Sequence, residues 1–240
     1  MRASCIRSRL GRVLRRFHSS DSVWYINWYG TCLDCDPGHD DAIAILLAVH
    51  CPNIQLLGLS TCHGNADPKD THANAVRLLH AFAAPVDVHA HRGALKPLLR
   101  PARTDPEIHG DDGLGGVDGL PTLEDPAVLE RWQLDGRRLA VDGMAKALKS
   151  VQSRHHSLSI PLTLYRSRNS FLNGHKVCIA TTGPMTNLAV LLTVHPELIE
   201  CIEEIVFMGG GVGIGNRSAV AEYNILCDRL SDLISLQPKS

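Results

Sequence analysis

The order of apolar segments along the chain is the feature that most restricts its fold. Short segments rich in β-branched and aromatic residues alternate with longer segments of helical character. We expect strands at 23–33, 54–62, 86–91, 176–183 and 202–210, and helices at 40–50, 70–82, 141–151 and 185–199. Strands that are apolar throughout and separated by helices are typical of a parallel sheet covered on both faces. The chain is therefore predicted to form an α/β fold with an open, mostly parallel sheet flanked by helices.

Three segments fall outside this alternation. Residues 92–136 are rich in Gly, Pro and Asp and are predicted to be a long functional loop region. Residues 151–176 contain no acidic residue and no clear periodicity, which indicates an inserted loop or a disordered stretch. The first twenty residues hold six arginines, four serines and no acidic residue. We therefore expect residues 1–22 to be a disordered or targeting arm, and residues 23–240 to form the α/β domain.

The composition is that of a soluble globular protein. The 240 residues are 44% hydrophobic and carry a formal net charge of −1, which favours neither nucleic-acid nor acidic partners. No apolar run reaches the roughly 18 residues that a membrane span needs, so none is expected. The eight cysteines are scattered, often in apolar segments, which is typical of thiols in a reducing compartment. We expect a cytoplasmic protein, with a mitochondrial location as the alternative that the arginine-rich start allows.

Four carboxylates stand close together after the first expected strand: Asp34, Asp36, Asp40 and Asp41. In an open α/β sheet, ligands bind beyond the carboxyl ends of the strands, which is where this segment lies. A Pro-Gly turn inside the cluster can bring its two halves together. Like charges held close together raise one another's pKa and destabilise the fold, and a bound cation removes that cost. Carboxylate oxygens favour a hard ion, Ca²⁺ or Mg²⁺.

Other interpretations of the acidic cluster make different demands. An EF-hand loop starting at Asp34 needs Gly and Glu where this chain has His39 and Ile45. A Mg²⁺-dependent phosphatase of the D-x-D type would use Asp34 as a nucleophile on phosphorus, and this alternative stays open. A solvated turn that only caps a helix would leave the charge repulsion uncompensated. Cys32 and Cys35 form a C-x-x-C in strand-like sequence with no second pair, which argues against a zinc or redox site.

Six motifs carry a resemblance to a known family. The acidic cluster reads D-x-D-P-G-x-D-D-A-x-A. It is followed, in order, by TCHGNA (61–66), IHGDDGLGG (108–116), ATTGPMTNLA (180–189), VFMGGG (206–211) and GNRSAVAEYNILCD (215–228). Together they strongly resemble the motifs of the inosine-uridine-preferring nucleoside hydrolase family, over about residues 31–228 apart from the segment 151–176. The resemblance implies that family's α/β fold and its reaction, the hydrolysis of the N-glycosidic bond of ribonucleosides to free base and ribose.

The resemblance also implies roles for individual residues. Asp36 would be the general base that activates a water bound to Ca²⁺, and Asp34 would support the site from behind. The calcium ligands would be Asp36, Asp41 and the main-chain carbonyl of Thr182. The residues expected to bind the substrate are Asp40, Asn65, Met208, Asn216, Glu222 and Asn224. A nucleoside is the expected partner, with a homo-oligomer possible, and neither nucleic acid nor a membrane is expected.

The resemblance also implies that the C-terminal part of the family's domain is missing here. In the family, a late His-Asp pair completes the calcium shell and helps the base to leave, whereas the sequence after Asp228 contains no histidine. Fewer charged ligands weaken calcium binding, and the loss of a leaving-group acid slows catalysis. The alternative to a nucleoside hydrolase is therefore a truncated, non-catalytic relative that binds calcium or ribose.

Overall fold

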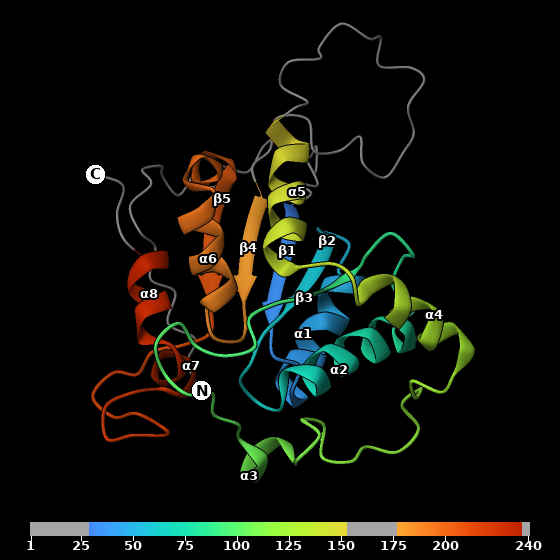
Figure 1. Cartoon of the computed structure of the whole chain (residues 1–240), viewed down its shortest axis with the longest axis horizontal. Helices are drawn as coiled ribbons and strands as arrows, with labels where there is room; N and C mark the ends of the chain where they lie inside the picture. Colours follow the sequence, from blue (N-terminus) through green and yellow to red (C-terminus); the bar gives the residue numbers. More distant parts are fainter. Residues whose placement is uncertain (1–28, 153–176, 237–240) are drawn as a thin grey trace, which may run out of the picture.

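A five-stranded parallel sheet forms the centre of the part of the fold that the structure describes. The computed structural model describes residues 29–152 and 177–236. The strands are β1 (Tyr29–Cys35), β2 (Ile54–Thr61), β3 (Ala90–Arg92), β4 (Val177–Thr181) and β5 (Ile202–Phe207). Their order across the sheet is β3-β2-β1-β4-β5, and each neighbouring pair is parallel (Figure 1). The open parallel α/β fold predicted from the sequence is confirmed.

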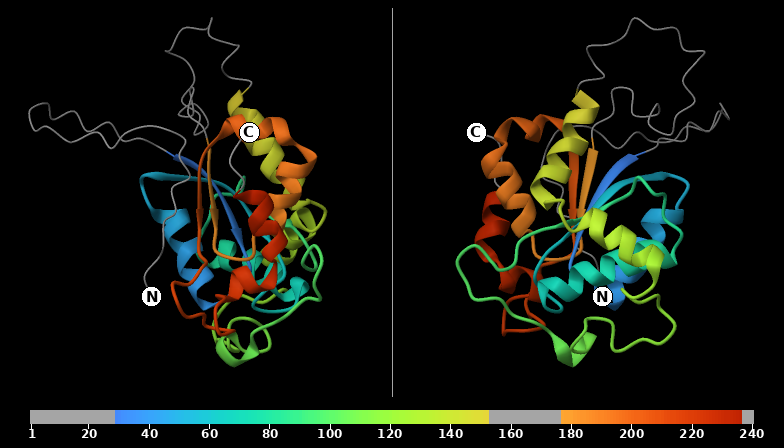
Figure 2. Two further views of the ribbon diagram at one scale, coloured as in Figure 1. Left: turned by 90° about the vertical axis from the view of Figure 1, so that its left-hand side faces the viewer. Right: turned by 45° about the vertical axis from the view of Figure 1, so that its right-hand side comes forward.

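Helices cover both faces of this sheet. Those on one face are α1 (His39–His50), α2 (Pro68–Ala81) and α4 (Pro126–Asp135), and those on the other are α5 (Ala140–Gln152), α6 (Thr186–Val194) and the 3₁₀ helix η3 (Pro196–Cys201). Figure 2 shows α1 on one side of the strands and α5 and α6 on the opposite side. Three short helices complete the described fold: α3 (Pro106–His109), α7 (Tyr223–Cys227) and α8 (Arg229–Ser235).

Alternating side chains of β1 divide the core into two clusters. Cys32 packs with Leu148 of α5 and Leu188 of α6, whereas Leu33 and Cys35 belong to the cluster beneath α1 and α2. This alternation is the period of two expected of a strand buried on both faces. Cys32 and Cys35 therefore lie on opposite faces, and both are free thiols. The geometry agrees with the sequence argument against a shared zinc or disulfide site.

Several predicted boundaries were wrong, each for a local reason. The second helix begins at Pro68 rather than at residue 70, because the Asp67 side chain caps it by accepting from the backbone N–H of Lys69. The region 92–136, predicted to be loop, contains α3 and α4, each with Pro in its first turn. The helix predicted at 185–199 ends at Val194, and the chain continues as η3 from Pro196.

The remaining expectations fall partly or wholly outside the described residues. The arm at 1–22 and the first part of the strand at 23–33 precede residue 29, so nothing tests them. The segment 151–176 begins inside α5, which extends to Gln152, and the rest of it lies outside the described residues. Within the described ranges, no helix has the length and apolar character that crossing a membrane requires.

Candidate active site

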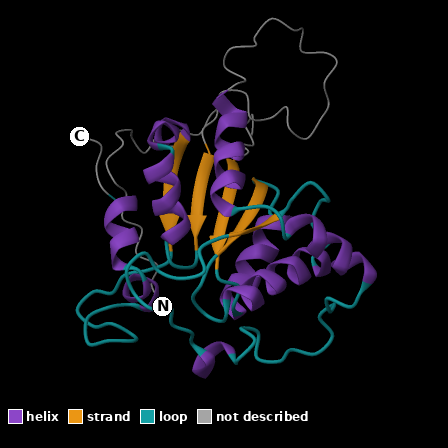
Figure 3. Ribbon diagram, viewed as in Figure 1, coloured by secondary structure: helices purple, strands orange, loops and turns teal. Residues whose placement is uncertain are grey.

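The acidic cluster lies where the strand order of the sheet reverses. The chain runs outward from β1 to β2 and β3, then returns to place β4 and β5 on the other side of β1. Ligands bind at such a switch point, beyond the carboxyl ends of the strands. The arrows of β1 and β4 in Figure 1 point to the edge where α3 and α7 lie, and Figure 3 shows loops gathered along this edge. Asp36 follows β1 there, and Thr182 follows β4.

Asn65 joins the two carboxylates that were predicted to hold calcium. Its backbone N–H donates to Asp36 Oδ2 at 2.9 Å. Its side-chain Nδ2 donates to the Asp36 carbonyl at 2.9 Å and to Asp41 Oδ2 at 3.0 Å. The loop after β2 therefore holds Asp36, which follows β1, close to Asp41, which lies in α1.

Asp41 connects this pair to the loop after β4. It is fully buried in the first turn of α1, where its Oδ2 also accepts from the backbone N–H of Gly38 at 3.0 Å. Its Oδ1 accepts from the Thr182 hydroxyl at 2.5 Å. The Thr182 carbonyl in turn accepts from Asn224 Nδ2 at 2.8 Å, which also donates to the Met208 carbonyl at 2.9 Å. All three expected calcium ligands thus lie in one hydrogen-bonded group.

Two glycines bring backbone against the Asp36 carboxylate. A Cβ on Gly64 would lie 1.8 Å from Asp36 Oδ2, and one on Gly183 would lie 2.5 Å from Oδ1. Gly64 also has a φ of +149°, which side chains rarely tolerate. The carboxylate is 1% exposed, and its Oδ1 has no hydrogen-bond partner. A buried carboxylate oxygen without a partner is costly unless something binds it.

Burial and mutual repulsion raise the pKa values of these acids, which disfavours their ionised forms unless a cation is nearby. Burial first, and then Asp41, raises the pKa of Asp36 well above its usual range. Burial, with Asp40 beside it, raises the pKa of Asp41 to about 6. Burial also raises the pKa of Asp34 to about 7, although its hydrogen bond from Asn187 acts in the opposite direction. A cation bound at the cluster would stabilise the ionised forms.

The oxygen donors of the site suit a hard cation, but only a few of them carry a negative charge. Two carboxylates and a main-chain carbonyl, from Asp36, Asp41 and Thr182, are the oxygen ligands that calcium prefers. In the part of the chain that the structure describes, no three His, Cys, Asp or Glu side chains form a metal-binding group. A cation at Asp36 would therefore depend on two acidic side chains, with main-chain oxygens and solvent completing its shell.

Asp34 lies behind the site rather than in it. Its Oδ1 accepts from Asn187 Nδ2 of α6 at 2.7 Å, and it is fully buried. Asn187 also donates to the Thr61 carbonyl at 3.0 Å and accepts from the Ala94 N–H at 2.8 Å. These contacts fit a supporting residue. They do not fit the nucleophile of a D-x-D phosphatase, because a phosphoester in solvent has no access to the Asp34 carboxylate.

The remaining predicted substrate residues are distributed around the rim. Asp40 is exposed in the first turn of α1, near His39, whose N–H donates to His109 Nδ1 at 3.3 Å. Glu222 caps α7 by accepting from the Ile225 N–H at 3.3 Å. Asn216 is exposed on the loop between β5 and α7. No hydrogen bond of the described residues joins Asp40, Asn216 or Glu222 to the Asp36–Asp41 pair, which distinguishes them from Asn65 and Asn224.

Sequence reasoning missed several residues that organise the site. They are Asn187, the hydroxyl of Thr182, and Tyr223, whose hydroxyl donates to the Gly64 carbonyl at 2.9 Å. Asn187 and Thr182 lie within the motif at 180–189, and Tyr223 lies within that at 215–228. The motifs therefore contain these residues, but no sequence pattern pairs them with the acidic cluster.

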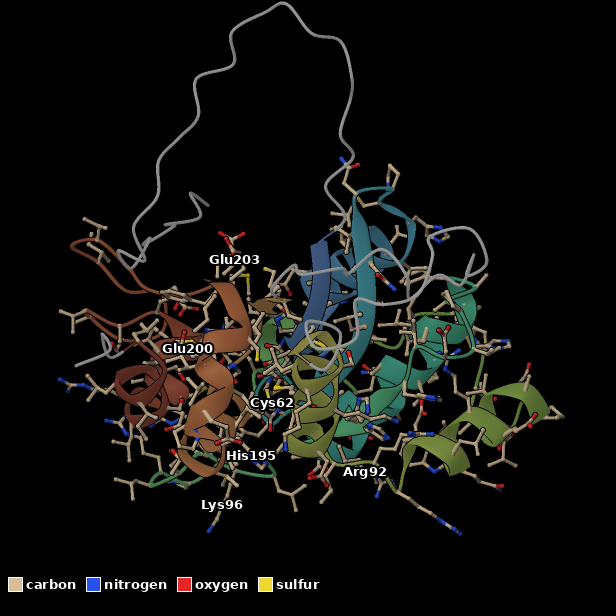
Figure 4. The ribbon with its side chains drawn as sticks, turned by 90° about the horizontal axis from the view of Figure 1, so that it is seen from above. Cys62, Arg92, Lys96, His195, Glu200 and Glu203 are labelled. Carbon is tan, nitrogen blue, oxygen red and sulfur yellow. The ribbon has the colours of Figure 1, made fainter. Side chains whose placement is uncertain are left out.

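A cysteine beside the site is not a nucleophile. Cys62 follows β2, and its Sγ donates to the carbonyls of Cys35 at 3.7 Å and Pro184 at 3.6 Å. Figure 4 places it in the interior of the molecule, whereas Glu203 of β5 is at the periphery. Burial, and then the charge of Asp34, raises the pKa of the Cys62 thiol well above its usual range. The protonated thiol is inert in this environment.

Comparisons with known proteins identify the family of this chain. The sequence model of the family described as inosine-uridine preferring nucleoside hydrolase matches residues 31–233. The pyrimidine-specific ribonucleoside hydrolase RihA of Shewanella woodyi is 39% identical over 196 residues, which are 82% of this chain and 53% of that protein. A purine-preferring ribonucleoside hydrolase from Gardnerella vaginalis is 27% identical with a TM-score of 0.64, over 85% of this chain and 56% of its own.

A second solved structure, an inosine-guanosine nucleoside hydrolase, has a TM-score of 0.68 and 27% identity, over 88% of this chain and 57% of its own. The chain spans about half the length of the curated relatives it matches, 53% in the case of RihA. The family model nevertheless covers both the acidic cluster and the loops that pack on it. The chain belongs to the inosine-uridine preferring nucleoside hydrolase family.

Proposed function

We propose that this protein hydrolyses the N-glycosidic bond of ribonucleosides, releasing free base and ribose, with Ca²⁺ held by Asp36, Asp41 and the Thr182 carbonyl. The single observation that supports this most is the buried Asp36–Asp41 pair, in which Asp36 Oδ1 has no partner. Hard oxygen donors and an uncompensated negative charge suit calcium. Family membership supports the type of reaction.

In this proposal Asp36 is the general base. The chemistry that calcium supplies when bound is a lower pKa for water and an anchor for sugar hydroxyls. Asp36 accepts the proton of the attacking water, and burial favours that protonated form because it raises the pKa of the carboxyl. Asp36 and Asp41 also face the positive charge that develops on the sugar ring as the glycosidic bond breaks.

Ribose is bound by residues beside the carboxylate pair and by residues of the rim. Asn65, which contacts Asp41, and Asn224, which contacts the Thr182 carbonyl, would hydrogen-bond sugar hydroxyls. Asp40, Asn216 and Glu222 supply further polar groups from α1 and from the loop before α7. Met208, which is 41% exposed, would offer apolar surface to the sugar. Such convergent polar groups select an orientation of the sugar.

The base preference is best tested with both classes of nucleoside. The name of one relative says pyrimidine-specific, and that of a structural neighbour says purine-preferring. Inosine and uridine therefore serve as paired substrates. We expect ribose release from at least one of them with calcium present, and its loss with a calcium chelator or in Asp36→Asn. Turnover that is unchanged in Asp36→Asn would contradict the proposal.

A second candidate function is binding of calcium or ribose without turnover. It is favoured by the donor set, because Asp36 and Asp41 are two acidic side chains and no group of three potential metal-binding side chains occurs among the described residues. Calcium affinity depends on the number of charged ligands, so a weakly held ion would leave the general base without an activated water. Calcium-dependent thermal stabilisation with no ribose release from either substrate would identify this case.

A further inference from the structure

An ion pair joins two loops that border the candidate site. The first loop spans 101–116 and contains α3, and the second spans 208–222 between β5 and α7. The guanidinium of Arg217 in the second loop donates to both carboxylate oxygens of Asp105 in the first, with Nε at 3.1 Å from Oδ2. Its Nη1 donates to Glu107 Oε2 at 3.2 Å. Figures 1 and 2 show both segments at the edge of the molecule that carries the carboxyl ends of the strands.

Asp105 is tied directly to the site. Its backbone N–H donates to the Asn65 carbonyl at 3.1 Å, and Asn65 holds both Asp36 and Asp41. The Asp105 carbonyl accepts from the His109 N–H at 3.1 Å, which fixes the turn of α3. Asp105 is 8% exposed, so its carboxylate is largely withdrawn from water. The acceptor of the ion pair is therefore a rigid part of the site.

The loop that carries Arg217 has few other anchors. Gly210 and Gly213 have φ values of +80° and +83°, and the loop presents Val212 to solvent at 96% exposure. Apart from those of Arg217, the hydrogen bonds described for residues 210–221 stay within the loop. One example is the bond from the Ala221 N–H to Ser218 Oγ. Met208 and Glu222 have contacts outside the loop at its two ends. Between those ends, the described side-chain contacts that reach outside the loop are made by Arg217. A glycine-rich loop without such a contact loses much conformational entropy when it is ordered.

We propose that Arg217 is a positioning residue, which locks the 208–222 loop onto Asp105 and so holds Asn216 on the same side of the site as Asn65. The role in substrate binding rests on the proposed function. Arginine suits this task because its planar guanidinium grips both oxygens of one carboxylate, whereas lysine offers a single point charge. The pairing acts on substrate binding through geometry, since Arg217 itself contacts neither Asp36 nor Asp41 in the described contacts.

Two measurements on the 240-residue chain test this proposal. The first is hydrogen exchange without substrate, in which Arg217→Met accelerates exchange about tenfold in peptides from both 101–116 and 208–222. The second is initial-rate kinetics with inosine and uridine. There Arg217→Met raises KM by about tenfold or more and changes kcat by less than about threefold, because binding groups are misplaced while Asp36 is untouched.

Matched variants separate the geometry from charge and from folding. Arg217→Lys keeps the charge but not the two-oxygen grip, so it retains most of the defect, whereas a purely electrostatic role would be rescued. Arg137→Met removes an exposed arginine after α4 and should change neither measurement. Asp105→Asn keeps the side-chain size and should reproduce the Arg217→Met effects, which provides a second variant if Arg217→Met folds poorly.

The outcomes are distinct. Unchanged exchange in both loops of Arg217→Met and Asp105→Asn overturns the lock itself. Faster exchange with an unchanged KM overturns the positioning role. A wild-type chain that neither binds nor cleaves either nucleoside contradicts the proposed function instead, and the exchange data alone then accept or reject the lock.

Discussion

The buried carboxylate centre and the exposed rim of this site are built in different ways. Around Asp36 and Asp41, the contacts come from strand ends, backbone groups and glycines, and the side chains are almost completely buried. At the rim, exposed residues such as Asn216 depend on loops joined by side chains such as Arg217. The centre is fixed by the fold itself, whereas the rim can change without disturbing the sheet. A family can therefore keep one reaction centre and vary what it binds.

Removing the proposed general base should have the largest effect on activity, because it changes the buried centre itself. Asp36→Asn keeps the shape of the side chain but cannot take a proton, so we expect kcat to fall by ~10²–10⁴. The ribose-release assay measures it, with Asp118→Asn, in the exposed loop before α4, as the control. A fall in kcat no larger than that of Asp118→Asn would show that Asp36 takes no part in the reaction.

A glycine of the centre gives the next largest effect. Gly64→Ala places a methyl group 1.8 Å from Asp36 Oδ2 at a φ of +149°, and should lower the free energy of unfolding by about 3 kcal/mol. Gly119→Ala is the matched control, because Gly119 also has a positive φ, +81°, but has nothing within 4 Å of its Cβ position. Urea unfolding compares the two. Equal losses would show that backbone strain alone matters, and not the approach to Asp36.

Asn187 tests how much the hydrogen bonds beneath the buried centre contribute to stability. Asn187→Ala removes three hydrogen bonds, including that to Asp34, and should cost about 2–3 kcal/mol of unfolding free energy. The exposed Asn53→Ala, in the turn before β2, should cost almost nothing. Chemical denaturation decides between them, and a cost similar to that of Asn53→Ala would mean that Asp34 needs no partner.

Acidity should affect the centre in a calcium-dependent manner. The pKa of Asp41 is raised to about 6 and that of Asp34 to about 7 in the folded state, so the folded chain binds more protons than the unfolded chain between about pH 4 and pH 7. Without calcium, the melting temperature should therefore fall by a few degrees as pH rises through this window. Millimolar calcium should reduce that fall, because it binds the ionised form. Parallel slopes with calcium and with chelator would contradict this coupling.

The smallest effect is expected at the second acid that Arg217 contacts, Glu107. The Glu107 side chain is 80% exposed, and its contact with Arg217 is a surface ion pair. Such pairs contribute little, so Glu107→Gln should leave KM within about twofold of wild type. Steady-state kinetics beside Asp105→Asn measures the difference. A larger effect on KM from Glu107→Gln than from Asp105→Asn would mean that Glu107, and not Asp105, is the main partner of Arg217.

The sequence predicts the centre far better than the rim. Asp36 and Thr182 directly follow β1 and β4. Asn65 lies in the loop after β2, and Asp41 lies in the first turn of α1. Parallel strands bring such positions to one edge of the sheet, and the family resemblance names these residues individually. The pairing of Arg217 with Asp105 joins residues 112 positions apart in two loops without periodicity, so no local pattern announces it. The start of α2 differs from the predicted residue 70 because Pro68 occupies the first turn of the helix and Asp67 caps it.

Calcium titration by calorimetry tests the central claim most directly, because it needs no substrate and no turnover. The account predicts a saturable binding heat for the wild-type chain that is strongly reduced in Asp41→Asn, with Asp118→Asn behaving like wild type. A folded wild-type chain that gives no calcium heat, or an Asp41→Asn variant that binds as tightly as wild type, would contradict it.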